Sequence, residues 1–119
     1  MEQKQAQTFM MVFSHTPNLE YQPTQEEMTA MQQDWGSFIG NIAMSEKLVS
    51  THQLGYEGKQ IAADRSVSEG IQISDSKTLS GNMLVNANSL EEAVTMAKDC
   101  PILKMGGSVE VRTTIPMNH

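Results

Sequence analysis

The segment 89–112 constrains the fold of this chain more than any other part of the sequence. Ser89 and Glu92 are spaced as a capping box, and an apolar stripe at helical spacing follows them. Pro101 disfavours helical geometry at the residue before it and therefore ends the helix. After a glycine pair, apolar and polar residues alternate over 109–115, as in a half-buried strand. The segment predicts a short capped helix followed by a closing strand.

The first half of the chain shows the same order of elements. Residues 9–13 are wholly apolar and predict a strand that is buried on both faces. Thr24 and Glu27 form a second potential capping box, and apolar residues then recur every three or four positions as far as residue 45. Residues 48–54 predict a second strand, which stops at a glycine. The apolar positions of this longer helix are Met28, Met31, Trp35, Phe38, Ile39 and Ile42.

Between these halves, residues 59–63 and 70–74 predict a peripheral hairpin around the polar loop 64–69. Residues 79–87 predict a further strand, in which Gly81 permits a bulge or a close backbone approach. The order is strand, helix, strand, hairpin, strand, helix, strand. It predicts an α+β, ferredoxin-like fold, with an antiparallel sheet, two helices on one face and a small hairpin.

The predicted sheet has one face that no helix covers. Strand 9–13 is apolar at both alternating sets of positions, so this face would expose large side chains to water. A second copy packed sheet against sheet would cover them, and a twofold dimer is the commonest closed assembly. We therefore expect a homodimer.

The length of 119 residues suits one domain, expected over 9–117 after a frayed or disordered lead of residues 1–8. Fourteen acidic and eight basic side chains give a net charge of −6, which disfavours nucleic acid, because phosphate binding needs clustered Lys and Arg. No apolar run approaches the ~20 residues that cross a bilayer, so we expect no membrane partner. A single cysteine and the lack of an apolar leader favour a cytoplasmic protein.

The chain resembles the YCII-related proteins, and within them the DGPF branch. The segments that carry this resemblance are Ser89-Leu90-Glu91-Glu92-Ala93, Ala97, Cys100-Pro101 and Gly107-Ser108-Val109-Glu110-Val111-Arg112. They are similar to that branch's second helix, Cys-Pro stop and Gly-x-Val-Glu-Val-Arg strand. Trp35, and the path from Phe38 to residues 48–49, are similar to the family's first helix and second strand. The resemblance implies a dimeric α/β barrel.

Two departures from the family bear on function. The Asp-Gly-Pro-Phe motif is replaced by Asp75-Ser76-Lys77-Thr78-Leu79, which keeps only the leading Asp and shortens the loop. YCII-type members carry a His early in the first helix and an Asp just before the proline after the second helix, suggested to act as a dyad. Here the first helix has no His, and Cys100 precedes Pro101. The resemblance therefore implies a fold without a defined reaction.

Three candidate pocket residues lie in the first half of the chain. His15 ends the first strand, where sheets commonly open into clefts, and an imidazole can act as acid or base near neutral pH. The alternative for His15 is a loop-end histidine bonded to water. His52 lies in the second strand and faces either the core or a partner sheet. Trp35, the single tryptophan, either packs in the core with its indole nitrogen bonded or stacks on a ligand.

Two further candidates, Arg65 and Asp75, lie in or beside the hairpin, where they could hold a polar ligand or face water in turns. The three histidines and one cysteine show no paired spacing, so we expect no metal and no cofactor. Cys100 at a helix C-terminus is expected to pack as a small side chain, because the helix dipole raises a thiol pKa there. No nucleophile elbow, phosphate loop or dinucleotide motif is present, so catalytic residues stay unassigned.

Three functions are compatible with these features. The first is a homodimer that binds an unknown small, partly apolar molecule between helices and sheet, without demonstrated catalysis. The second is a small metal-independent enzyme, such as a lyase, isomerase or oxygenase, with His15 or His52 as general base and Asp75 as a polar partner; it rests on analogy of fold. The third is a regulatory partner of another protein, which an acidic surface suits better than DNA.

Overall fold

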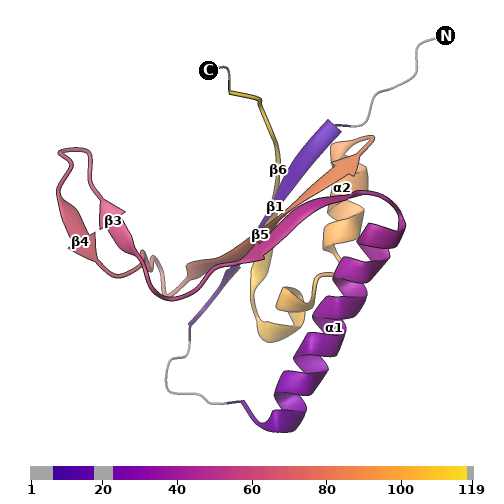
Figure 1. The fold of residues 1–119 in the computed structure, drawn as a ribbon, viewed down its shortest axis with the longest axis horizontal. Coiled ribbons are helices and arrows are strands. Elements are labelled where there is room, and N and C mark those ends of the chain that lie inside the picture. The colour runs from indigo at the N-terminus through magenta and orange to yellow at the C-terminus, as the bar shows by residue number, and fades with distance from the viewer. Residues whose placement is uncertain (1–6, 18–22, 118–119) are drawn as a thin grey trace.

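Two halves of the chain contribute to one antiparallel sheet in the computed structural model, which describes residues 7–17 and 23–117 (Figure 1). The elements are β1 (Gln7–His15), α1 (Gln25–Met44), β2 (Leu48–Gln53), β3 (Lys59–Ile61), β4 (Val67–Glu69), β5 (Thr78–Ala87), α2 (Leu90–Ala97), the 3₁₀ helix η1 (Pro101–Met105) and β6 (Ser108–Thr113). The four-stranded sheet has the order β2-β5-β1-β6 and is antiparallel throughout. The expected α+β class is confirmed, and the strand order is compatible with a ferredoxin-like fold.

Both helices begin where the sequence predicts. In α1 the Thr24 hydroxyl accepts from the Glu27 amide at 3.1 Å, and the Glu27 carboxylate accepts from the Thr24 amide at 3.1 Å. In α2 the Ser89 hydroxyl accepts from the Glu92 amide at 3.1 Å. The Glu92 carboxylate instead accepts from Lys47 Nζ at 2.7 Å, and this bond lowers the pKa of Glu92. The cap of α2 therefore also ties the helix to the start of β2.

The core lies between the two helices and one face of the sheet. Alternate residues of β1 and β5 are buried on this face, and they form one cluster with buried residues of α1, α2 and η1. The buried apolar residues are Phe9, Met11, Phe13, Phe38, Ile42, Met83, Val85, Ala87, Ala93, Ala97, Cys100 and Ile102. Both helices therefore share one face of the sheet, as expected.

The opposite face is only half-buried in its centre, and no described helix packs on it. Met10 pairs across the strands with Leu84, and Val12 pairs with Asn82 on one side and Glu110 on the other. We call this surface the helix-free face. Met10 and Val12 lie on this face and Met11 on the other, which confirms that β1 carries apolar side chains on both sides.

The β3–β4 hairpin projects away from the sheet as an arm (Figure 1). Its second strand was predicted at 70–74, and that prediction is wrong: β4 pairs Glu69 with Lys59. Asp64 Oδ1 accepts from the Ser66 amide and hydroxyl at 2.9 and 2.6 Å, which closes the turn early and lowers the pKa of Asp64. Gly70, at φ 90°, then ends the strand.

Three local features differ from the sequence prediction: the start of β1, the helix before β6 and the end of β6. Most of the expected lead 1–8 lies outside the described residues, but Gln7 and Thr8 belong to β1. The 3₁₀ helix η1 was not predicted; it ends at Gly106, which adopts φ 81°. β6 ends at Thr113, and Ile115, which was expected to be buried, is 84% exposed.

Candidate functional site

A pocket of about 640 Å³ lies between the N-terminal half of α1 and the adjoining end of the sheet. Its wall is mainly apolar, and polar side chains from several elements also line it. The apolar side chains include Phe13, Met28, Met31, Trp35, Ile39 and Met105. The polar side chains include His15, Gln32, Gln53 and Tyr56. The volume and the lining are typical of a small-molecule site, for which ~300–1,000 Å³ is usual.

The unequal lengths of the two helices leave room for this pocket. The 20 residues of α1 span about 30 Å, whereas the eight residues of α2 span about 12 Å. The short α2 therefore covers only part of the helix-bearing face. At the other part, η1 contributes Ile102 and Met105 to the pocket wall, and the N-terminal half of α1 overhangs an open space.

The end of β1 carries His15 into this pocket. The register between β1 and β5 shifts after Phe13: Phe13 pairs with Gly81 but Ser14 pairs with Leu79, so Ser80 is an extra residue. The extra residue lies in β5, so the bulge bends β5 next to the end of β1 that carries His15. A Cβ on Gly81 would lie 2.5 Å from the carbonyl oxygen of His52, which confirms the predicted close backbone approach.

His15 forms one side of a polar pair with Tyr56. Its Nε2 lies 2.7 Å from the Tyr56 hydroxyl, and the two rings are tilted by 41° at a centroid distance of 6.1 Å. The other ring nitrogen, Nδ1, is buried and has no hydrogen-bond partner in the described structure. An unsatisfied buried polar atom costs about 1–3 kcal/mol, so it calls for an explanation. Because Nδ1 has almost no accessible surface, a molecule in the pocket would meet other atoms of the His15–Tyr56 pair and not Nδ1 itself.

Trp35 lies between the core and the pocket. Its ring meets Phe13 edge-on at a centroid distance of 5.4 Å and Phe38 at 6.0 Å. It also lines the pocket and is only half-buried. Trp35 is thus part of the core on one side and of the pocket wall on the other.

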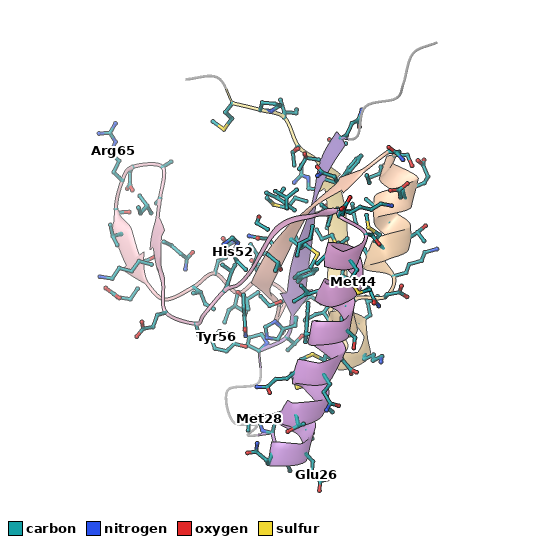
Figure 2. All side chains as sticks on the ribbon, turned by 45° about the vertical axis from the view of Figure 1, so that its right-hand side comes forward. Glu26, Met28, Met44, His52, Tyr56 and Arg65 are labelled. Carbon is teal, nitrogen blue, oxygen red and sulfur yellow. The ribbon has the colours of Figure 1, made fainter. Side chains whose placement is uncertain are left out.

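The remaining three candidates do not join His15 and Trp35 in the pocket interior. His52 borders the pocket from the edge strand, but it is exposed and its cross-strand partner is Asn82, which belongs to the helix-free face. Arg65 lies at the tip of the arm, well away from Tyr56 and Met28 (Figure 2). Asp75 is exposed in the tight turn before β5, at φ 52°, and does not line this pocket.

Several pocket residues were not singled out from the sequence. Tyr56 lies in the loop after β2, and nothing in the sequence pairs it with a residue 41 positions earlier. Met28 was assigned to the core, yet it is 40% exposed at the pocket. One signal was present: the apolar stripe of the first predicted helix is much longer than that of the second, so part of it has no partner helix.

Cys100 is 2% exposed in the core, and burial raises its pKa to about 11. A thiol with such a pKa stays protonated at neutral pH and is a poor nucleophile. Residues 7–17 and 23–117 contain no cluster of three His, Cys, Asp or Glu side chains able to hold a metal ion. Within the same residues, neither α-helix has the length and hydropathy of a membrane span.

The fold and the pocket define an α+β protein with a small-molecule-sized cavity at one end of its sheet. The sequence matches no protein-family model, and no curated protein matches it either. Membership of the YCII-related family therefore stays a prediction from the residues themselves.

Proposed function

We propose that this chain is a YCII/DGPF-type homodimer, cytoplasmic as its single cysteine indicates, that binds a small, partly apolar molecule in the pocket beside α1. One observation carries the proposal. The apolar side chains of Met28, Met31 and Trp35 and the polar side chains of His15 and Gln32 line one cavity of about 640 Å³. Such a combination favours an occupied site, because a ligand would cover the apolar wall and hydrogen-bond to the polar side chains.

The homodimer is supported by the helix-free face. Its centre carries Met10, Val12 and Leu84, whereas Glu110 and Arg112 on the edge strand β6 give it a polar border. An apolar centre within a polar rim is typical of a protein interface. Opposite charges side by side on one strand can also pair with their copies across a twofold axis.

Pocket binding can be tested with a thermal-shift screen of a metabolite library. A compound present at a hundred times its dissociation constant should stabilise the protein by about 2.7 kcal/mol. Met31→Trp adds bulk inside the pocket and should abolish the shift. Met44→Trp is the matched control, because Met44 lies on the same helix and is 83% exposed outside the pocket; it should retain the shift. Compounds that bind both variants equally, or a screen without any hit, would contradict the proposal.

The dimer is tested separately by light scattering during gel filtration at micromolar concentration. The wild-type protein should elute with twice the mass of one chain. Val12→Lys puts a charge in the middle of the helix-free face and should give monomers. Gln33→Lys, on an exposed position of α1, should leave the dimer intact. A monomeric wild-type protein would overturn the dimer and leave the pocket proposal standing.

A second candidate function is a small metal-independent enzyme in which His15 acts as general base. The observation that favours it is the contact of His15 Nε2 with the Tyr56 hydroxyl at 2.7 Å beside the pocket, because such a contact orients the imidazole ring. Asp75 does not serve as the polar partner considered from the sequence, because it lies outside the pocket; Tyr56 takes that place. Turnover of a compound found in the screen, lost in His15→Phe, would support catalysis. Binding of every hit without turnover would count against it.

A further inference from the structure

The β3–β4 arm has little to hold it in place within one chain. Its strands are three residues long and pair with each other, and neither makes an extended contact with any other element that the structure describes. Ile61 and Val67 are cross-strand partners on the arm, and their side chains are 74% and 59% exposed. A lone two-stranded hairpin is only marginally stable in water, so this arm indicates a contact outside the chain.

The arm projects from the sheet on the side opposite the helices (Figure 1). A groove of about 500 Å³ lies at its base, with Lys59 of the arm on one side and Ser14, Leu79 and Ser108 of the sheet on the other. Ser14 pairs across the strands with the other two sheet residues, and it lies two positions along β1 from Val12, on the helix-free face. A molecule packed on the helix-free face would therefore also contact the arm.

The charges of this region favour a second copy of the chain as that molecule. Residues 59–69 of the arm contain two cationic and two anionic side chains, and β6 carries Glu110 and Arg112 at the border of the helix-free face. Such balanced charges suit contact with an identical surface across a twofold axis, where each charge can lie opposite its complement. A nucleic acid would need clustered Lys and Arg, which the arm does not provide.

We infer that the arm of each copy packs against the other copy in the homodimer and that this contact buries Ile61 and Val67. This contact presupposes the dimer proposed above through the helix-free face, and it adds a second area of contact to that dimer. It also gives the hairpin the covering layer that it lacks within one chain. Twofold symmetry supplies the contact twice, once from each arm.

Two charge substitutions on neighbouring residues test the contact. Side chains alternate along a strand, so Val67 shares one face of the arm with Ile61, whereas Ser68 lies on the other face. Val67→Lys should raise the dissociation constant of the dimer by about tenfold or more, because every dimer carries the added charge twice. Ser68→Lys is the matched control and should leave the constant unchanged. Both residues are exposed in the single chain, and sedimentation equilibrium at several concentrations measures the constant.

Amide hydrogen exchange of the arm is a second test, and it needs no substitution there. In the wild-type dimer, the amides that bond β3 to β4 should exchange slowly, and their exchange should become faster on dilution below the dissociation constant. Val12→Lys, which should be monomeric, should show the faster exchange at every concentration.

The outcomes distinguish the arm contact from the dimer itself. A wild-type dimer that Val67→Lys and Ser68→Lys affect equally, or an arm that exchanges equally fast in dimer and monomer, would overturn the arm contact and leave the dimer through the helix-free face standing. A wild-type monomer would overturn both. An arm that exchanges slowly in the monomeric Val12→Lys variant would show that it needs no second copy, which also overturns the inference.

Discussion

The two halves of α1 carry the same apolar pattern but meet different surroundings. In the C-terminal half, Phe38 and Ile42 are each 5% exposed and pack into the core. In the N-terminal half, Met28 is 40% exposed, and Met28 and Met31 line the pocket; Trp35, in the middle of the helix, borders both the pocket and the core. One amphipathic stripe thus forms the core at one end and a candidate binding site at the other.

The difference comes from the neighbouring elements and not from the helix itself. A stripe at helical spacing shows which side of a helix is apolar, but it does not show what lies opposite. The eight-residue α2 is much shorter than the 20-residue α1. The C-terminal half of α1, which packs into the core, is here called the closed half, and the N-terminal half, which borders the pocket, is called the open half. Substitutions at matched positions in the two halves should therefore have unequal effects.

The largest contrast is expected between Phe38→Ala and Met31→Ala. Phe38 is buried in the core, so its truncation should leave a cavity and lower the free energy of unfolding by about 3–5 kcal/mol. Met31 already borders an open space, so Met31→Ala should cost less than about 1 kcal/mol. Urea denaturation of both variants measures the difference. Equal losses would mean that the pocket half of the helix is packed as tightly as the core half.

A smaller contrast is expected between two glycines, Gly81 and Gly36. A Cβ on Gly81 would lie 2.5 Å from the backbone oxygen of His52, so Gly81→Ala should push β2 away from β5 at the pocket and cost about 1–3 kcal/mol. Gly36, inside α1, has nothing within 4 Å of such a Cβ. Gly36→Ala should therefore stabilise the helix by about 0.5–1 kcal/mol. Thermal unfolding of both variants measures these changes in stability. If Gly81→Ala leaves the stability unchanged, β2 can move away from β5 at little energetic cost.

The buried core also predicts a pH dependence of stability, through the thiol of Cys100. Burial raises the pKa of its thiol from 9.0 in the unfolded chain to about 11. The unfolded state then releases its proton at lower pH than the folded state, so this contribution to stability is complete below pH 9 and is lost as the pH rises to 11. Urea midpoints measured from pH 8 to 11 should fall more steeply for the wild-type protein than for Cys100→Ala. Parallel curves would show that the thiol is accessible to water.

The sequence allowed the order of elements and both helix starts to be predicted, because caps and periodicity are local signals. Thr24 and Ser89 cap as expected, and the strands at 9–13 and 79–87 pair with each other. The second strand of the arm was misplaced because the Ser66 amide and hydroxyl donate to the Asp64 carboxylate, and these hydrogen bonds decide where the turn closes.

The pocket was predictable only in part. His15 and Trp35 were chosen as candidates for their places near a strand end and on a helix stripe, and both line the pocket, as His52 does at its border. Tyr56 was missed because its bond to His15 joins residues that are close only in the folded chain. Arg65 and Asp75 are polar residues in turns, and composition alone does not distinguish a turn that faces water from one that faces a ligand.

The smallest expected effect is a difference in local stability between variants that lack one of the two helix caps. Thr24→Ala removes the capping box at the pocket end of α1, and Ser89→Ala removes the cap of α2 beside the core. Each should cost about 1 kcal/mol or less. The first turn of α1 is exposed among the described residues, so Thr24→Ala should speed amide hydrogen exchange there without changing exchange in β1 and β5. Ser89→Ala should instead speed exchange through α2 and the strands on which it packs. If Thr24→Ala also speeds exchange in β1, the open half of α1 unfolds together with the core, and the pocket is as cooperative a part of the domain as the sheet.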